Sequence, residues 1–163
     1  MSTMALIRPP TSAEGPVLLA MHKRLYIDHR EKILDADELL ATQFRNFESV
    51  LAQDLKGLLR DPRAEVLVAE LQGRIVGYIS ARVHEDARRV LPRRGEIEDW
   101  FVETEVRGNG VGQSLMQGIR KRLTERGCQV MQSSTWAENT GAIAAHERVG
   151  FRRARVIFRQ TLE

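Results

Sequence analysis

Residues 105–119 read EVRGNGVGQSLMQGI. Directly after Arg107, three glycines alternate with other residues. They are Gly108, Gly110 and Gly112, and an amphipathic helical pattern follows them. Glycine permits tight turns and lets a ligand approach the backbone closely. A loop that leads into a helix also presents unpaired N–H groups and the positive end of the helix dipole. These features predict an anion site, most naturally for a phosphate group.

Two common phosphate-binding motifs do not match this loop. A P-loop requires Gly-Lys followed by Ser or Thr, whereas Gly112 is followed by Gln113 and Ser114. A dinucleotide-binding fingerprint has the spacing G-x-G-x-x-G, and Gln113 stands where its third glycine would fall. Taken alone, the glycines are equally consistent with a tight strand-to-helix turn that binds nothing.

Two carboxylates stand side by side in the predicted strand EIEDWFVE, residues 96–103. A strand in the middle of a sheet carries Glu98 and Asp99 together only if at least one faces a cleft or a partner charge. Glu98 is therefore a candidate general base. The alternative is that both lie near the exposed end of the strand. Strict alternation predicts two opposite sets of side chains, Glu98, Trp100 and Val102 against Ile97, Asp99 and Phe101.

A second polar pair occupies the predicted helix ENTGAIAAHERV, residues 138–149. Asn139 and His146 are seven residues apart and so share one helix face, two turns apart. Small residues keep the segment between them thin, which favours a ligand lying against it. The alternative is a small-residue helix packed on the sheet. The small residues are Gly141, Ala142, Ala144 and Ala145.

The elements that position these residues follow from the apolar pattern. Thr11 and Glu14 have the spacing of a capping box and predict a helix that ends near Asp28. Apolar residues at helical spacing predict a helix over 35–60, and the turn Gln72-Gly73 predicts a hairpin. The predicted strands are 4–8, 65–71, 74–83, 96–103, 128–135 and 155–162. Helices closed by Gly127 and Gly150 complete a mixed α/β (α+β) arrangement of helices around one sheet.

Length and composition set the broad class. A chain of 163 residues with 42% hydrophobic residues predicts a single domain over 1–163. We find no span that could cross a membrane and no secretory signal, and a single cysteine, Cys128, fits a reducing cytoplasm. His22, His29 and His84 form no metal-ligand pattern, so we expect no metal site and assign them as surface or core residues. A net charge of +3 suits an anionic ligand or nucleic acid without requiring either.

Two motifs together resemble the GNAT N-acetyltransferase superfamily. VETEVRGNGVG is similar to its acyl-CoA pyrophosphate motif, Q/R-x-x-G-x-G/A, although Thr104 stands at the usual proline position. NTGAIAAHERVGF is similar to N-x-x-A-x-x-x-Y-x-x-x-G-F, with His146 in place of the tyrosine. The resemblance covers the chain from about Glu65 to the end. The matching residues are Val102, Arg107, Gly110, Gly112, Asn139, Ala142, Gly150 and Phe151.

The resemblance implies a GNAT-like, mostly antiparallel sheet with one splayed pair of parallel strands, here 96–103 and 128–135. It implies acetyl-CoA as co-substrate, Glu98 as the base and His146 as the acid that protonates the leaving thiolate. A histidine that only links helix to sheet is the alternative for His146. Unpaired amides around Phe101 to Glu103 would bind the pantetheine arm and polarise the thioester. The implied cofactor-binding residues are Phe101, Val102, Glu103, Arg107, Gly108, Asn109, Gly110, Val111, Gly112, Gln113, Asn139 and Ala142.

A further resemblance concerns the acceptor. IEDWFVETEVRGNGVG, AENT and AHERVGF look like aminoglycoside 6′-N-acetyltransferases, which favours a small polycationic amine such as an aminoglycoside or polyamine. Alternatives are acetylation of a protein N-terminus or lysine, and a non-catalytic acyl-CoA-binding or nucleic-acid-binding module. No aromatic residues interleave the arginines, so nucleic acid is not favoured. The resemblance also implies a homodimer through the C-terminal segment RVIFRQTLE. We expect a locally negative cleft from Glu96, Glu98, Asp99, Glu103, Glu105 and Glu138.

Overall fold

Five strands form one sheet in the computed structural model, which describes residues 4–162 and so leaves out residues 1–3 and 163 of the expected domain. The first four strands pair antiparallel in chain order, and the fifth joins the fourth in parallel. This confirms the expected mixed sheet with one parallel pair. The strands are β1 (Leu6–Arg8), β2 (Ala64–Leu71), β3 (Arg74–Glu85), β4 (Arg93–Val102) and β5 (Val130–Ser133).

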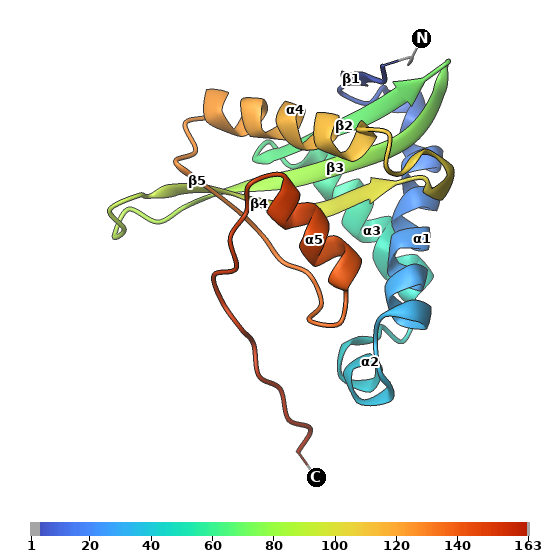
Figure 1. Cartoon of the computed structure of the whole chain (residues 1–163), viewed down its shortest axis with the longest axis vertical. Helices are drawn as coiled ribbons and strands as arrows, with labels where there is room; N and C mark the ends of the chain where they lie inside the picture. Colours follow the sequence, from blue (N-terminus) through green and yellow to red (C-terminus); the bar gives the residue numbers. More distant parts are fainter. Residues whose placement is uncertain (1–3, 163) are drawn as a thin grey trace.

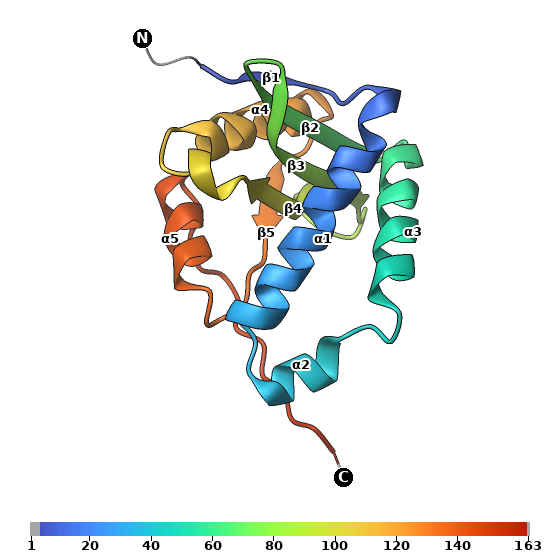
Figure 2. The same ribbon diagram turned by 90° about the vertical axis from the view of Figure 1, so that its right-hand side faces the viewer.

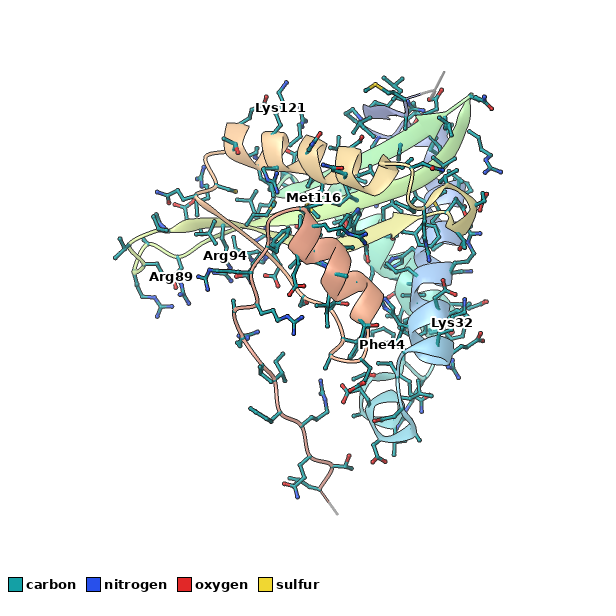
Figure 3. The ribbon with its side chains drawn as sticks, viewed as in Figure 1. Lys32, Phe44, Arg89, Arg94, Met116 and Lys121 are labelled. Atoms are coloured by element: carbon teal, nitrogen blue, oxygen red, sulfur yellow. The ribbon has the colours of Figure 1, made fainter. Side chains whose placement is uncertain are left out.

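Helices cover both faces of the sheet. Figure 2 shows α1 and α3 side by side on one face, with α4 and α5 on the other. In Figure 3, Met116 on the buried face of α4 points toward the sheet, whereas Lys121 on the opposite face points toward solvent. No helix within the described residues is long and apolar enough to cross a membrane. The helices are α1 (Gly15–Lys32), α2 (Ala36–Thr42), α3 (Phe47–Arg60), α4 (Val111–Glu125) and α5 (Thr140–Arg148), with short 3-10 turns η1 (Ser12–Glu14) and η2 (Thr104–Val106).

The two faces carry separate apolar clusters. Leu115, Met116 and Ile119 of α4 are fully buried against β2, β3 and β4. On the opposite face, Leu18 of α1 and Leu55 of α3 pack against Tyr78, Phe101 and neighbouring residues. Removal of this apolar surface from water is the main force that holds the helices on the sheet.

Local signals predicted several element ends correctly. Thr11 and Glu14 form the expected capping box at η1, where α1 begins. Arg8 binds Glu14 there, and together with the Thr11 N–H it lowers the pKa of Glu14 to about 2. Gln72 and Gly73 both have positive φ, as a tight hairpin turn requires. Gly127 ends α4 at φ +75°, and the next N–H, of Cys128, donates to Leu123 O at 2.9 Å.

The predicted helix over 35–60 is wrong as a single element, because the chain turns between α2 and α3. Tyr26 of α1 stacks on Phe44 and Phe47, with ring centroids 5.8 and 5.3 Å away. Its hydroxyl also accepts the Phe44 N–H at 3.2 Å. Two aromatic side chains that continue the helical spacing thus close around a third ring, and the backbone between the helices bends to allow it.

The predicted final strand, 155–162, is also wrong for this chain. Residues 152–162, here called the C-terminal arm, form no strand. The arm runs away from the sheet to the C-terminus (Figure 1). Its apolar side chains are exposed, Val156 by 74% and Phe158 by 92%. A β-strand needs a partner for its N–H and C=O groups, and the described part of the chain supplies none here.

Candidate active site

The candidate site lies where the parallel strands β4 and β5 separate. Their pairing runs from Arg94, opposite Val130, to Ile97, opposite Ser133, and stops there. The edge of β4 from Glu98 to Val102 is therefore open on the side that faces β5. This is the splayed pair that the resemblance implies.

The amides at this open edge differ from those expected. The Glu103 N–H donates to Val76 O at 2.8 Å, and Phe101 lies opposite Tyr78 in the same ladder. Because the N–H and C=O groups of successive residues alternate between the two sides of a strand, those of Phe101 and Glu103 point toward β3. The backbone groups of Trp100 and Val102 face the opening instead. Trp100 was missed by sequence reasoning, which did not settle the pairing of β4.

A β-bulge controls which side chains reach the opening. Ser80 pairs with Asp99 and Ala81 with Ile97, so Glu98 is an extra residue on β4. The extra residue shifts the alternation, and the predicted grouping of faces is wrong. Ile97, Trp100 and Val102 face α4, whereas Glu98, Asp99 and Phe101 face α1.

Glu98 is exposed at one side of the strand and forms an ion pair with Arg82, which also binds Asp61 at 2.8 Å. Burial raises the pKa of Glu98, and the positive charge of Arg82 opposes this without cancelling it. A carboxylate whose pKa is raised toward neutrality is better suited to accept a proton from an ammonium group.

Asp99 lies beside a histidine that the sequence gave no reason to single out. His22 Nδ1 of α1 is 3.4 Å from Asp99 Oδ2 and 3.1 Å from the Tyr78 hydroxyl. Burial by itself would lower the pKa of His22, but the hydrogen bond and charge of Asp99, together with the charges of Asp54 and Glu98, outweigh it and the pKa is raised. Burial also raises the pKa of Tyr78. His22 lies far from Asp99 in sequence, so no local pattern indicates this contact.

The expected negative cleft is largely compensated by basic side chains. Among the described residues, each carboxylate near the opening except Glu138 has a cationic or imidazole neighbour. A polycationic acceptor would therefore compete with the protein's own cations for these carboxylates. The pairs are Glu96 with His84, Glu98 with Arg82, Asp99 with His22, Glu103 with Arg24 and Glu105 with Arg74.

The glycine loop supplies open backbone N–H groups next to this edge. Gly108 and Gly110 have φ of +81° and +82°, and a Cβ on either would meet nothing within 4 Å. Within residues 4–162, the N–H groups of residues 108–113 donate no loop, turn or capping hydrogen bond. Open space, unsatisfied donors and the start of α4 fit the pyrophosphate of acetyl-CoA. The loop residues are Gly108, Asn109, Gly110, Val111, Gly112 and Gln113, of which Val111 is buried by its side chain.

Arg107 and Trp100 tie this loop to the strand. Arg107 Nε donates to Val102 O at 2.8 Å, so the residue holds the strand end while the rest of its guanidinium stays exposed. A Cβ on Gly112 would lie 3.4 Å from the Trp100 ring. The Trp100 ring also meets the His146 ring edge-on, with centroids 5.2 Å apart. Trp100 thus brings the first turn of α4 and the helix α5 together.

Asn139 and His146, the two polar residues singled out around α5, are both engaged within the protein. Asn139 caps the helix, and its Oδ1 accepts the Ala142 N–H at 3.1 Å. His146 Nδ1 is 2.7 Å from Ala142 O, and Nε2 is 2.7 Å from Ser133 Oγ at the end of β5. The sequence brought Asn139, Ala142 and His146 to one helix but gave no signal for Ser133. Within residues 4–162, no group of three potential ligands could hold a metal ion.

Comparison with known proteins identifies the family. A model of the acetyltransferase (GNAT) family matches residues 31–151. An aminoglycoside N(6')-acetyltransferase type 1 of Stenotrophomonas maltophilia is 29% identical over 116 residues, which are 68% of this chain and 76% of that protein. A mycothiol acetyltransferase of Sanguibacter keddieii is 36% identical over 90 residues, 55% of this chain but only 29% of the relative.

Solved structures agree on the fold. The aminoglycoside N-acetyltransferase AAC(6')-Iy in complex with CoA superposes with a TM-score of 0.75 at 22% identity, covering 96% of this chain and 94% of that one. The family model spans most of the chain and includes both the glycine loop and α5. The protein therefore belongs to the GNAT family of acetyltransferases.

Proposed function

We propose that the protein transfers the acetyl group of acetyl-CoA to a primary amine of a small polycationic molecule, with aminoglycosides as the first candidates. The observation that carries this proposal is the position of Glu98, a carboxylate of raised pKa on the β-bulge where the β4 edge opens. The resemblance to the Stenotrophomonas maltophilia enzyme supports the acceptor class.

The chain's own groups divide the work. The N–H groups of residues 108–113 hold the pyrophosphate, and Arg107 adds positive charge beside it. The outward N–H groups of Trp100 and Val102 bind the pantetheine arm and polarise the thioester carbonyl. Glu98 accepts a proton from the ammonium group of the acceptor, which frees the lone pair for attack. Acetyl-CoA supplies the activated acetyl group.

The first test is thiol release from acetyl-CoA, screened across aminoglycosides, polyamines and N-terminal peptides, with acetyl-CoA binding followed by calorimetry. We expect binding, and release with aminoglycosides or polyamines. Release only with peptides would favour the protein N-terminal or lysine acetyltransferase instead. Binding without release from any amine would favour an acyl-CoA-binding module, and no binding would refute the assignment of the glycine loop. Tight, steeply salt-dependent DNA binding would point to a nucleic-acid module.

We also propose that residues 1–163 act as one domain that pairs with a second copy through the C-terminal arm. The arm exposes Val156, Ile157, Phe158 and Leu162, and within the described chain the outer edge of β5 has no partner strand. Pairing would bury this surface and satisfy the edge. Light scattering should show a dimer that the Phe158→Asp substitution dissociates. A wild-type protein that stays monomeric at high concentration would refute the pairing.

A further inference from the structure

Ser133 lies where β4 and β5 separate, and no sequence motif indicated it. It is the last residue of β5 and pairs with Ile97, the last paired residue of β4 before the strands separate. Its hydroxyl is 2.7 Å from His146 Nε2. Any hydrogen that Nε2 donates along this contact goes to Ser133, so His146 reaches the opening through the serine.

The opposite nitrogen of the ring fixes the tautomer. Ala142 O can only accept a hydrogen bond, so Nδ1, 2.7 Å away, carries the hydrogen. In the neutral ring Nε2 is then an acceptor, and the Ser133 hydroxyl donates to it. In the imidazolium ring Nε2 donates to Ser133 Oγ, and the hydroxyl hydrogen must point elsewhere. Protonation of His146 therefore releases the Ser133 O–H toward the opening.

Uncharged groups surround the imidazole. Besides Ser133, its ring contacts the edges of Trp100 from β4 and Phe151, which follows α5. The charged groups of the neighbouring elements are engaged elsewhere or exposed. Arg120 of α4 donates to Val149 O, Glu147 of α5 pairs with Arg153 of the C-terminal arm, Arg148 is exposed, and Glu98 pairs with Arg82. The charge state of the ring is thus coupled chiefly to the Ser133 hydroxyl.

We propose that Ser133 is the proton donor to the leaving thiolate of CoA and that His146 reprotonates Ser133. The step rests on the acetyl transfer proposed above. The amine nitrogen forms a bond to the thioester carbon, and the carbon–sulfur bond breaks with its electron pair going to sulfur. Ser133 Oγ gives its proton to sulfur and takes the proton of His146 Nε2, which leaves the ring neutral. Of the two protons lost by the ammonium nitrogen, one goes to Glu98 and one to water.

The kinetic test compares Ser133→Ala with its exposed neighbour, Ser134→Ala. We expect kcat with acetyl-CoA to fall about tenfold to a hundredfold in Ser133→Ala only, with little change in KM for acetyl-CoA. Ser133→Thr, which keeps a hydroxyl, should recover most of the rate. The alkaline decline of kcat that reports loss of the imidazolium should disappear in Ser133→Ala. Equal rates in the two alanine variants would overturn the proposal. Slowing of Ser133→Ala with the alkaline decline intact would do the same, since Ser133 would then only position the ring.

A second readout needs no acetyl transfer. Nitrogen NMR of His146 should show Nδ1 protonated in the neutral ring. When CoA is bound as its thiolate, at alkaline pH, the Ser133 hydroxyl donates to sulfur, so the Nε2 signal should move toward the protonated form in wild type and in Ser134→Ala, but not in Ser133→Ala. An Nε2 signal that ignores CoA in the wild type would refute the relay. A protein that shows this shift but acetylates no amine would instead refute the proposed function.

Discussion

The two sides of the opening between β4 and β5 are built from different chemistry. On the side that faces α1, Glu98, Asp99 and Glu103 each lie beside Arg82, His22 or Arg24. On the side that faces α5, the polar groups are a hydroxyl, an imidazole and a carbonyl oxygen, those of Ser133, His146 and Ala142. In the proposed mechanism, a carboxylate on the α1 side accepts a proton, and its readiness to do so depends on the neighbouring positive charges. On the α5 side, the proposed donation depends on which atom carries the hydrogen in the hydrogen bond between Ser133 and His146. The first should therefore respond to neighbouring charges, and the second to loss of a single hydrogen-bonding atom.

The largest effect is expected from Glu98→Gln on the α1 side. Loss of the base should lower kcat/KM for the amine about 10²- to 10⁴-fold, while calorimetry shows unchanged acetyl-CoA binding. Glu96→Gln is the matched control, because Glu96 lies on the same strand but beside His84. A threefold or smaller loss in Glu98→Gln would remove it as the base.

On the α5 side, His146→Ala should lower kcat about tenfold to a hundredfold, with little loss of acetyl-CoA affinity. Groups that act as one unit are not additive. We therefore expect the double variant with Ser133→Ala to be no slower than the slower single variant. Multiplying losses would show that the two residues act separately, and unchanged turnover in His146→Ala would exclude it as the source of the proton that Ser133 passes to sulfur.

Arg82→Met should sharpen the contrast by changing pH dependence more than rate. Arg82 lowers the pKa of Glu98, so its removal should raise that pKa further. The acid limb of kcat/KM should then move upward by about one pH unit. Arg63→Met is the control, because Arg63 pairs with Asp61 but not with Glu98. An acid limb of kcat/KM at the same pH in both variants would contradict the role given to Arg82.

The smallest effect is on stability and separates two histidines of α1. The pKa of His22 is raised, so its contribution is present below its ordinary value of 6.5 and is lost as pH rises through the folded value. Burial lowers the pKa of His29, so its contribution is lost as pH falls. Urea unfolding of His22→Gln and His29→Gln should show destabilisation with opposite pH trends. Parallel trends would contradict the Asp99 contact.

Many of the residues and helix ends discussed above could be predicted from the sequence. The glycine loop, Glu98, Asn139 and His146 were identified from residue types and spacing, and glycines or caps marked the ends of α4 and α5. Each of these signals is local, so the chain near the residue carries it. The pairing of β2 with β3 likewise follows from the tight turn at Gln72 and Gly73.

What escaped prediction depends on long-range contact. The bulge at Glu98 carries no glycine or proline, and only the pairing of β4 with β3 reveals it. Two contacts come from α1. Tyr26 stacks on Phe44 where the predicted second helix is interrupted, and His22 contacts Asp99 of β4. The C-terminal arm has apolar residues typical of a strand, but within the described chain it does not pair with the free outer edge of β5.

The open N–H groups of residues 108–113 have a consequence for experiments on this protein. Amides without hydrogen-bond partners exchange their hydrogen with solvent quickly, and a bound pyrophosphate would shield them. Hydrogen–deuterium exchange of this one loop would then report occupancy directly. Ligand analogues that cannot react could be ranked in this way before any acceptor is known.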